Sequence, residues 1–330
     1  MMKKFLVILM SLVMILSLTA CGGNSSTEPE TNKSDNAADS VSNEEKTLKF
    51  AYVVKNQTNP FFISMAQGFK DACDKNGIEY VVQATESEDE IDAQIQMCET
   101  LLTQNYDAIM VTPLSSSAVV PFIQSCNDSE VPIILIDTGA DEEALEAIGA
   151  EADYFATSDN KQSGVLAAQA LVDVLGNEGR IAVLNGSAGS TTGIAIAEGF
   201  HEVLDASNLT IAAEQAADWN RNLGYDVFTN ILSANPNLDG VVCANDEMAL
   251  GAVRAIEDAG MEMIPIFSIN ATQDGIDAVK AGTIVGTVDK KAYEQGYSAV
   301  EKALSLLNGQ ELSAKVEMLE PSMVNASNAG

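Results

Sequence analysis

The stretch LKFAYVVKNQTNPFFISMAQGFKDACDKNGIEYVVQA, residues 48–84, decides the fold of this chain. It begins and ends with apolar runs typical of buried strands, over residues 48–55 and 79–84. Asn59 and Pro60 suit the start of a helix, and apolar side chains then recur at helical spacing, at Phe62, Met65, Phe69 and Ala72. The stretch therefore predicts a strand, a helix over 61–76 and a second strand, which is the βαβ unit of a parallel sheet.

The same alternation continues to the C-terminus in two series. The first series predicts further strands over residues 108–112, 133–136 and 152–156, with helices over 91–104 and 117–128. The second predicts strands over 180–184, 210–216, 240–243, 265–269 and 283–288, with helices over 161–175, 193–204, 223–233, 247–259, 273–281 and 292–307. We therefore expect an α/β chain with two doubly wound parallel-sheet lobes.

Side chains suited to binding a small polar molecule follow the ends of several predicted strands. In doubly wound sheets, ligands bind beyond the carboxyl ends of the strands. Carboxylates accept hydrogen bonds from hydroxyl groups, amides donate and accept them, and aromatic faces cover the C–H face of a polyhydroxylated ring. The candidate binding residues at these positions are Lys55, Asn59, Phe61, Phe62, Asp137, Thr138, Ser158, Trp219, Asn245 and Asn270.

Several of these residues also have a purely structural interpretation. Asn59 and Asp246 suit helix caps, and Trp219 suits simple packing. The aromatic pair at 61–62 suits a core-facing helix surface, although consecutive helical residues cannot both face the core fully. Asp137 is harder to explain in this way, because it carries a charge to the mouth of a buried sheet.

The N-terminal residues have the features of an export signal. Lys3 and Lys4 precede an apolar run over residues 5–18, which is too short for a membrane span and is followed by small residues. We therefore expect a signal peptide over residues 1–20.

The residues after the apolar run indicate a lipid anchor. Leu18-Thr19-Ala20-Cys21 resembles the lipobox of bacterial lipoproteins, in which the cysteine becomes the acylated first residue. The alternative is an ordinary signal peptide that ends near a cysteine. Residues 21–46 contain almost no large apolar side chain, so we expect a lipidated Cys21 followed by a disordered tether. This predicts a protein held by lipid at the extracytoplasmic face of the cell membrane.

The charge of the chain limits its partners. The formal net charge is −31, and a surface this acidic repels a phosphate backbone. We therefore exclude nucleic acid as a partner.

Four cysteines remain after Cys21, namely Cys73, Cys98, Cys126 and Cys243. An even number in an exported chain is compatible with two disulfides. Each of these cysteines, however, lies in an apolar helix or strand, so we predict four buried thiols.

Enzymes and repressors are two further classes that the sequence disfavours. The Gly-rich stretch 186–193 lacks the lysine of a phosphate-binding loop, and no GxGxxG, GxSxG or HExxH motif is present. His201 is the only histidine, and the turn at 235–240 is a poor calcium loop. We expect no catalytic residue, cofactor or metal. Sugar-responsive repressors carry an N-terminal helix-turn-helix, whereas this chain begins with an export signal.

Five motifs resemble the ribose/allose branch of the bacterial periplasmic sugar-binding proteins. They are Asn59-Pro60-Phe61-Phe62, Thr112-Pro113-Leu114-Ser115-Ser116, Ser158-Asp159-Asn160, Ala217-Asp218-Trp219-Asn220-Arg221 and Asn245-Asp246-Glu247-Met248-Ala249. The resemblance implies the type I periplasmic binding protein fold, with lobes over 47–157 plus 291–319 and 158–290 plus 320–330 joined by a three-strand hinge. It also implies a monomer that passes a sugar or sugar-like ligand to an ABC transporter permease. The alternative is a receptor that presents a sugar or furanone-type signal to a membrane kinase or chemoreceptor.

The chain departs from the pattern of that branch at three positions. Where the relatives place an arginine, an aspartate and a hinge glutamine, this chain has Ile196, Asn270 and Lys290. D-Allose-binding members share Lys55, so the resemblance implies two ammonium groups, those of Lys55 and Lys290, against the one carboxylate of Asp137. This balance predicts an acidic ligand, or a less hydroxylated one such as a deoxy sugar, a polyol or a furanone. The alternative is that a neighbouring residue replaces the arginine and the ligand is an ordinary sugar.

Overall fold

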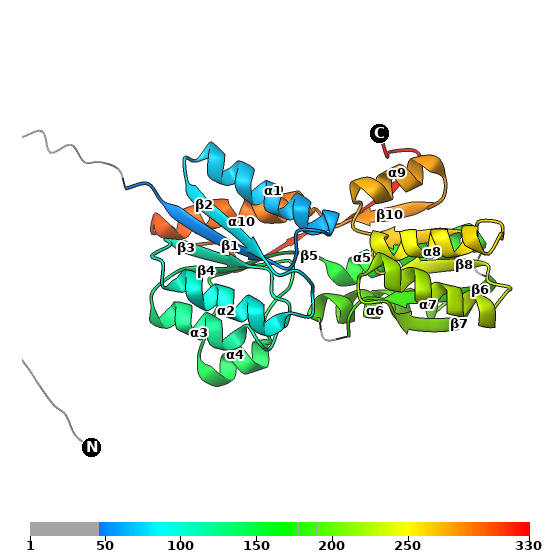
Figure 1. Ribbon diagram of the computed structural model, residues 1–330, viewed down its shortest axis with the longest axis horizontal. Helices are drawn as coiled ribbons and strands as arrows, with labels where there is room; N and C mark the ends of the chain where they lie inside the picture. The colour runs from blue at the N-terminus through cyan, green and yellow to red at the C-terminus, as the bar shows by residue number, and fades with distance from the viewer. Residues whose placement is uncertain (1–45, 177, 189) are drawn as a thin grey trace, which may run out of the picture. The chain divides into compact units, whose positions relative to one another are not determined.

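The computed structural model describes residues 46–176, 178–188 and 190–330 (Figure 1). The expected signal peptide, Cys21 and all but the last residue of the expected tether lie outside the described residues. Within the described residues, no helix combines the length and the apolar character that crossing a membrane requires.

The first lobe is built on a six-stranded parallel sheet in the order β11-β5-β4-β3-β1-β2. Its strands are β1 (Lys49–Val54), β2 (Glu79–Ala84), β3 (Ala108–Val111), β4 (Ile133–Ile136), β5 (Tyr154–Ser158) and β11 (Val316–Leu319). Helices α1 (Pro60–Lys75) and α10 (Ala292–Leu307) cover one face, and α2 (Ile91–Leu102), α3 (Val120–Asp128) and α4 (Glu142–Ile148) lie on the other side (Figure 1).

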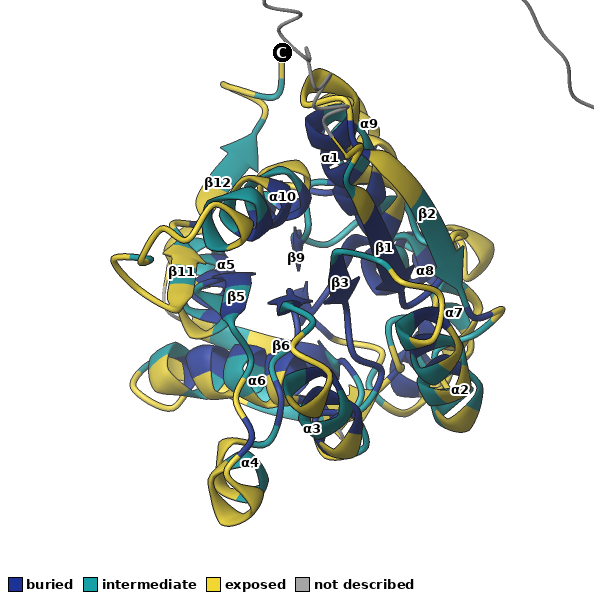
Figure 2. Ribbon diagram, turned by 90° about the vertical axis from the view of Figure 1, so that its left-hand side faces the viewer, coloured by how far each residue is buried: buried dark blue, intermediate teal, exposed yellow. Residues whose placement is uncertain are grey.

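Both faces of this sheet are buried, as the alternation along β1 shows. Phe50, Tyr52 and Val54 pack into the core under α1 and α10, whereas Ala51 and Val53 pack into the core under α2 and α3. Strands buried on both faces have continuous apolar runs in the sequence, and these runs allowed the strands to be predicted. In Figure 2 the central strands are dark blue, and the exposed surface lies mainly on the outer sides of the helices.

The second lobe repeats this arrangement in the order β12-β10-β9-β8-β6-β7. Its strands are β6 (Glu178–Asn185), β7 (Asn208–Ala216), β8 (Gly240–Cys243), β9 (Ile266–Ile269), β10 (Gly286–Asp289) and β12 (Ser322–Asn325). Its helices are α5 (Asn160–Leu175), α6 (Thr191–Leu204), α7 (Arg221–Ala234), α8 (Asp246–Asp258) and α9 (Gln273–Ala281). All pairs are parallel except β10–β12, so the predicted α/β fold of two doubly wound lobes is confirmed, with one antiparallel edge strand.

Between residues 46 and 330, as far as the structure describes them, the chain passes between the two sheets three times, after β5, after β10 and between β11 and β12. The hydroxyl of Ser158, at the end of β5, donates to the carbonyl of Leu319 at 3.0 Å. The amide of Asp159 donates to the same carbonyl at 3.1 Å. Two of the passages are thereby hydrogen-bonded to each other.

Some elements differ from the sequence prediction. The strand expected at 152–156 runs two residues later, and the strand expected at 283–288 begins only at Gly286. Helix α4 and strands β11 and β12 were not predicted as elements. The two strands are four residues long, lie at sheet edges and expose much of their surface, so they carry no apolar run that a sequence pattern would reveal.

The four cysteines of the described residues are buried free thiols, as predicted. Burial is the main cause of their raised pKa values, and it brings the pKa of Cys73 and that of Cys98 to about 12. These thiols therefore stay protonated and unreactive in the folded protein.

Candidate ligand-binding site

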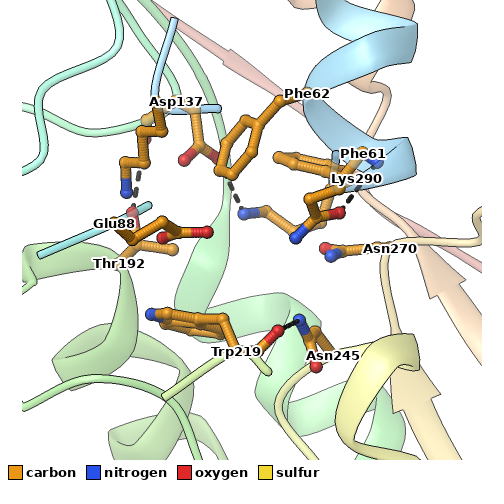
Figure 3. A pocket seen from close by; sticks show the side chains of 11 residues that line it. Phe61, Phe62, Glu88, Asp137, Thr192, Trp219, Asn245, Asn270 and Lys290 are labelled. Atoms are coloured by element: carbon orange, nitrogen blue, oxygen red, sulfur yellow. Dashed lines mark hydrogen bonds and ion pairs between the residues drawn. The ribbon is translucent and has the colours of Figure 1, made fainter. Parts of the chain in front are cut away.

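A cavity lies between the carboxyl ends of the two sheets (Figure 3). Its empty volume is about 300 Å³, which includes open solvent at its mouth. Both lobes line it, through Lys55, Asn59, Phe61, Phe62, Glu88, Asp137, Thr192, Trp219, Asn245, Asn270 and Lys290.

The start of α1 supplies the aromatic wall of the first lobe. Asn59 is the N-cap, and its Oδ1 accepts a hydrogen bond from the amide of Phe61 at 3.0 Å. The rings of Phe61 and Phe62 meet edge to face, with centroids 5.4 Å apart. Both side chains are buried and both line the cavity, so one turn of helix presents two aromatic surfaces to a ligand.

A buried ion pair lies beside this wall. Lys290 Nζ is 2.8 Å from Asp137 Oδ1, and the two side chains are 2% and 3% exposed. The same ammonium lies 4.9 Å from the centroid of the Phe61 ring. Burial by itself would raise the pKa of Asp137, but Lys290, Lys55 and the hydroxyl of Thr138 together hold that pKa below its usual range. Asp137 is therefore ionised in the folded protein.

The second ammonium, that of Lys55, has no such partner. Its side chain belongs to a residue only 4% exposed, and its Nζ lies 5.6 Å from the centroid of the Phe62 ring. In the described part of the chain, no hydrogen bond or ion pair involves this nitrogen. Its charge interacts with the carboxyl groups of Glu88 and Asp137 without a hydrogen bond to either, so its three donors are available to a ligand.

Glu88 adds a second carboxylate to the cavity, which corrects the charge balance expected from the sequence. Its Oε1 accepts from Asn56 Nδ2 at 3.0 Å. Burial raises the pKa of Glu88, and the nearby charge of Lys55 opposes that rise. Two carboxyl groups therefore line the cavity with the two ammonium groups, so the single carboxylate expected from the sequence is wrong.

The second lobe supplies Trp219 on a strained turn after β7. Trp219 has a φ of 64°, in the left-handed region that ordinary residues avoid. Its indole lies against Gly186, where a Cβ atom would be 2.0 Å from Cζ2 of the ring. Asn245 Nδ2 donates to the Trp219 carbonyl at 3.0 Å, so the turn is fixed from two sides.

Asn245 and Asn270 complete the wall of the second lobe. Asn245 is the N-cap of α8, and its Oδ1 accepts from the amide of Met248 at 2.9 Å. Asn270 follows β9 with a φ of 119°, and its amide group lines the cavity (Figure 3). Asn270 therefore offers a donor and an acceptor to a ligand.

The structure brings nine of the predicted residues together in the cavity, and leaves Thr138 and Ser158 outside its lining. Thr138 is buried behind Asp137 and donates to its Oδ2 at 3.1 Å, whereas the Ser158 hydroxyl is engaged by Leu319. Ile196, expected in the place of a cleft arginine, is 1% exposed and packs in the core of the second lobe. The residue of α6 that lines the cavity is Thr192.

Glu88 and Thr192 were missed by the sequence analysis. Glu88 lies in the charged stretch 86–90 between β2 and α2, where no pattern separates the residue that turns inward from its neighbours. Thr192 lies in a Gly-rich stretch, which signals an unusual turn without indicating which side chain faces the ligand.

Comparison with known proteins shows the family. Residues 50–311 match the family model described as a periplasmic binding protein domain. The chain is 30% identical to the ribose import binding protein RbsB of Bacillus subtilis, over 96% of this chain and 97% of that protein.

Two solved structures share the fold. One is an ABC transporter periplasmic solute binding protein from Actinobacillus succinogenes with bound D-allose, at a TM-score of 0.83 and 33% identity, covering 86% of this chain and 99% of that one. The other, from Bacillus halodurans with bound myo-inositol, has a TM-score of 0.78 and 27% identity, covering 86% and 96%.

Proposed function

The chain belongs to the family of periplasmic binding protein domains, which bind solutes and are not enzymes, and we propose that it captures a sugar or cyclic polyol for an ABC importer. The observation that carries this proposal is the cavity itself. Phe61 and Phe62 line it from the first lobe and Trp219 lines it from the second, with hydrogen-bonding groups between them. Such walls suit the apolar faces of a ring, and the polar groups suit its hydroxyls. The ligands of the two solved relatives, D-allose and myo-inositol, support the same chemistry.

A thermal-shift screen tests this function. Because bound ligand raises the melting temperature by mass action, pentoses, hexoses, cyclic polyols and uronic acids can be compared directly. We expect a clear rise with at least one neutral sugar or polyol. No rise with any of them at millimolar concentration would contradict sugar binding.

The charge balance of the cavity favours a neutral ligand over an acidic one. Lys290 is matched by Asp137, and the charge of Lys55 is felt by Glu88. A carboxylate on the ligand would disturb this balance, and removing that carboxylate from water would cost free energy. We expect Glu88→Gln to strengthen binding of a uronic acid relative to its parent sugar, with Asp89→Asn, an exposed neighbour, as the matched control. An unchanged preference in Glu88→Gln would contradict the proposed neutrality.

Capture of the ligand involves closure of the lobes, with boundaries at 47–157 plus 291–319 and 158–290 plus 320–330. The three passages between the sheets are the places where a few residues can absorb such a rotation. Small-angle scattering with the bound sugar should show a smaller radius of gyration than without it. A ligand that binds tightly without compaction would contradict closure.

The finer localisation is also a proposal. The residues Leu18-Thr19-Ala20-Cys21 support lipid attachment at Cys21 and anchoring at the extracytoplasmic face of the cell membrane. Cys21→Ala should release the protein from the membrane fraction or leave the precursor unprocessed. Unaltered fractionation of this variant would refute the anchor.

A further inference from the structure

Asp246 is a buried carboxylate that lies behind the cavity and does not line it. It is 0% exposed, and within the described residues no lysine, arginine or histidine forms an ion pair with it. Four donors surround it. Oδ1 accepts from the hydroxyls of Ser268 and Thr287, both at 2.6 Å, and Oδ2 accepts from the amide and the hydroxyl of Thr272, at 2.7 and 2.8 Å.

These donors come from the elements that frame the cavity residue Asn270. Ser268 lies in β9, Thr287 lies in β10 and Thr272 is the N-cap of α9. One carboxylate therefore joins two neighbouring strands to the start of a helix, with Asn270 on the turn between them. Burial raises the pKa of Asp246, and the hydrogen bonds from Ser268, Thr287 and Thr272 oppose that rise, so these bonds offset part of the cost of burying the carboxyl group.

The turn held in this way is strained. Asn270 has a φ of 119° and Ala271 a φ of 48°, and neither residue is glycine. Such conformations persist only where their surroundings enforce them. The amide of Ala271 donates to the Thr287 hydroxyl at 3.1 Å, and that hydroxyl in turn donates to Asp246. The carboxylate thus reaches both residues that follow Asn270.

The start of α9 leaves room for this carboxylate. A Cβ atom at Gly275 would lie 2.3 Å from Asp246 Oδ2, so any other residue there would collide with it. The helix approaches Asp246 closely because glycine occupies this position.

We propose that Asp246 is a positioning residue, which holds the 270–272 turn so that the Asn270 amide faces the cavity before ligand arrives. This inference rests on the proposed function for its effect on binding, but the arrangement of the turn can be measured without ligand. A preformed site avoids the cost of ordering a loop during binding.

Hydrogen exchange of the ligand-free protein tests the positioning directly. Asp246→Asn keeps the shape of the side chain but directs an amide group at two of the donors. We expect the amides of Ala271 and Thr272 to exchange about tenfold faster or more, because their acceptors are lost or weakened. Asp274→Asn, on the exposed side of α9, is the matched control and should leave these amides unchanged. Unchanged exchange in Asp246→Asn would overturn the proposal.

Binding of D-allose, followed by isothermal titration, distinguishes positioning from general destabilisation. We expect Asp246→Asn to weaken binding about tenfold in the wild-type background, but less than about threefold beside Asn270→Ala, where the positioned residue is already absent. An equal factor in both backgrounds would show a merely structural role and overturn the proposal. If Asp246→Asn does not fold, Thr287→Val removes one donor and is expected to show the same pattern more weakly. Failure of wild-type protein to bind D-allose would count against the ligand, while the exchange experiment still decides the positioning.

Discussion

Replacing Lys290 by methionine should leave a buried charge without its counter-ion. Methionine keeps the apolar stem over Phe61 but removes the ammonium that lies 2.8 Å from Asp137. Asp137 is 3% exposed, so its carboxylate is poorly solvated in the folded protein. Breaking such a pair by removing one partner costs about 3–5 kcal/mol. Lys55 also lowers the pKa of Asp137 and remains in place, so we expect a cost near the lower limit, about 3 kcal/mol at pH 7.

The loss should be visible as a lower melting temperature and should depend on pH. About 3 kcal/mol corresponds to a decrease of roughly 6–12 °C for a chain of this size. In the wild-type protein the folded pKa of Asp137 lies below its unfolded value, so its contribution is present above the unfolded pKa and lost as the pH falls through the folded pKa. In Lys290→Met we expect burial to raise that pKa above the unfolded value. The variant then recovers stability as the pH falls from 7 towards the unfolded pKa.

Calorimetry of both proteins between pH 7.5 and 4.5, at roughly unit intervals of pH, measures this difference. The control is Lys291→Met, because Lys291 pairs with Asp289 in a half-exposed position and such pairs contribute about 1 kcal/mol or less. The reasoning is refuted if Lys290→Met costs no more than the control at pH 7, or if the gap to wild type does not narrow on acidification.

Three further outcomes are expected. Gly186→Ala should displace Trp219, because a Cβ atom there would lie 2.0 Å from the ring, and should weaken sugar binding about tenfold or more. Trp219 is the only tryptophan, so tryptophan fluorescence reports both its displacement and ligand binding, and an unchanged emission spectrum would contradict this packing. A thiol reagent should label none of the four buried cysteines in the folded protein, and all four in denaturant. Rapid labelling under native conditions would contradict their burial. Asp137→Ala and Asn245→Ala should each weaken binding strongly in titration calorimetry, because each leaves ligand hydroxyls without a buried partner, and unchanged affinity in both would remove these residues from the site.

Local pattern was sufficient to predict much of the fold and part of the site. A strand buried on both faces has a continuous run of apolar residues, and a helix has apolar residues at helical spacing. The sequence therefore predicted the two doubly wound lobes. The residues after each strand were candidates for the site because the carboxyl ends of parallel strands meet at one edge. The sequence also predicted Asn59 as the N-cap of α1, because capping depends on residues close together in the chain.

The identity of the inward-facing side chains was decided by tertiary structure. Lys290 and Asp137 are 153 residues apart, and only the docking of a passage between the sheets onto β4 makes them an ion pair. Glu88 enters the cavity from a stretch rich in carboxylates, whereas Ser158 turns away to bind Leu319. A sequence pattern describes the residues of one helix or strand, whereas a binding site forms where segments that are distant in the sequence come together. The sequence by itself therefore determined which strand ends meet, and the packing of the two lobes determined which side chains, and which charges, face the ligand.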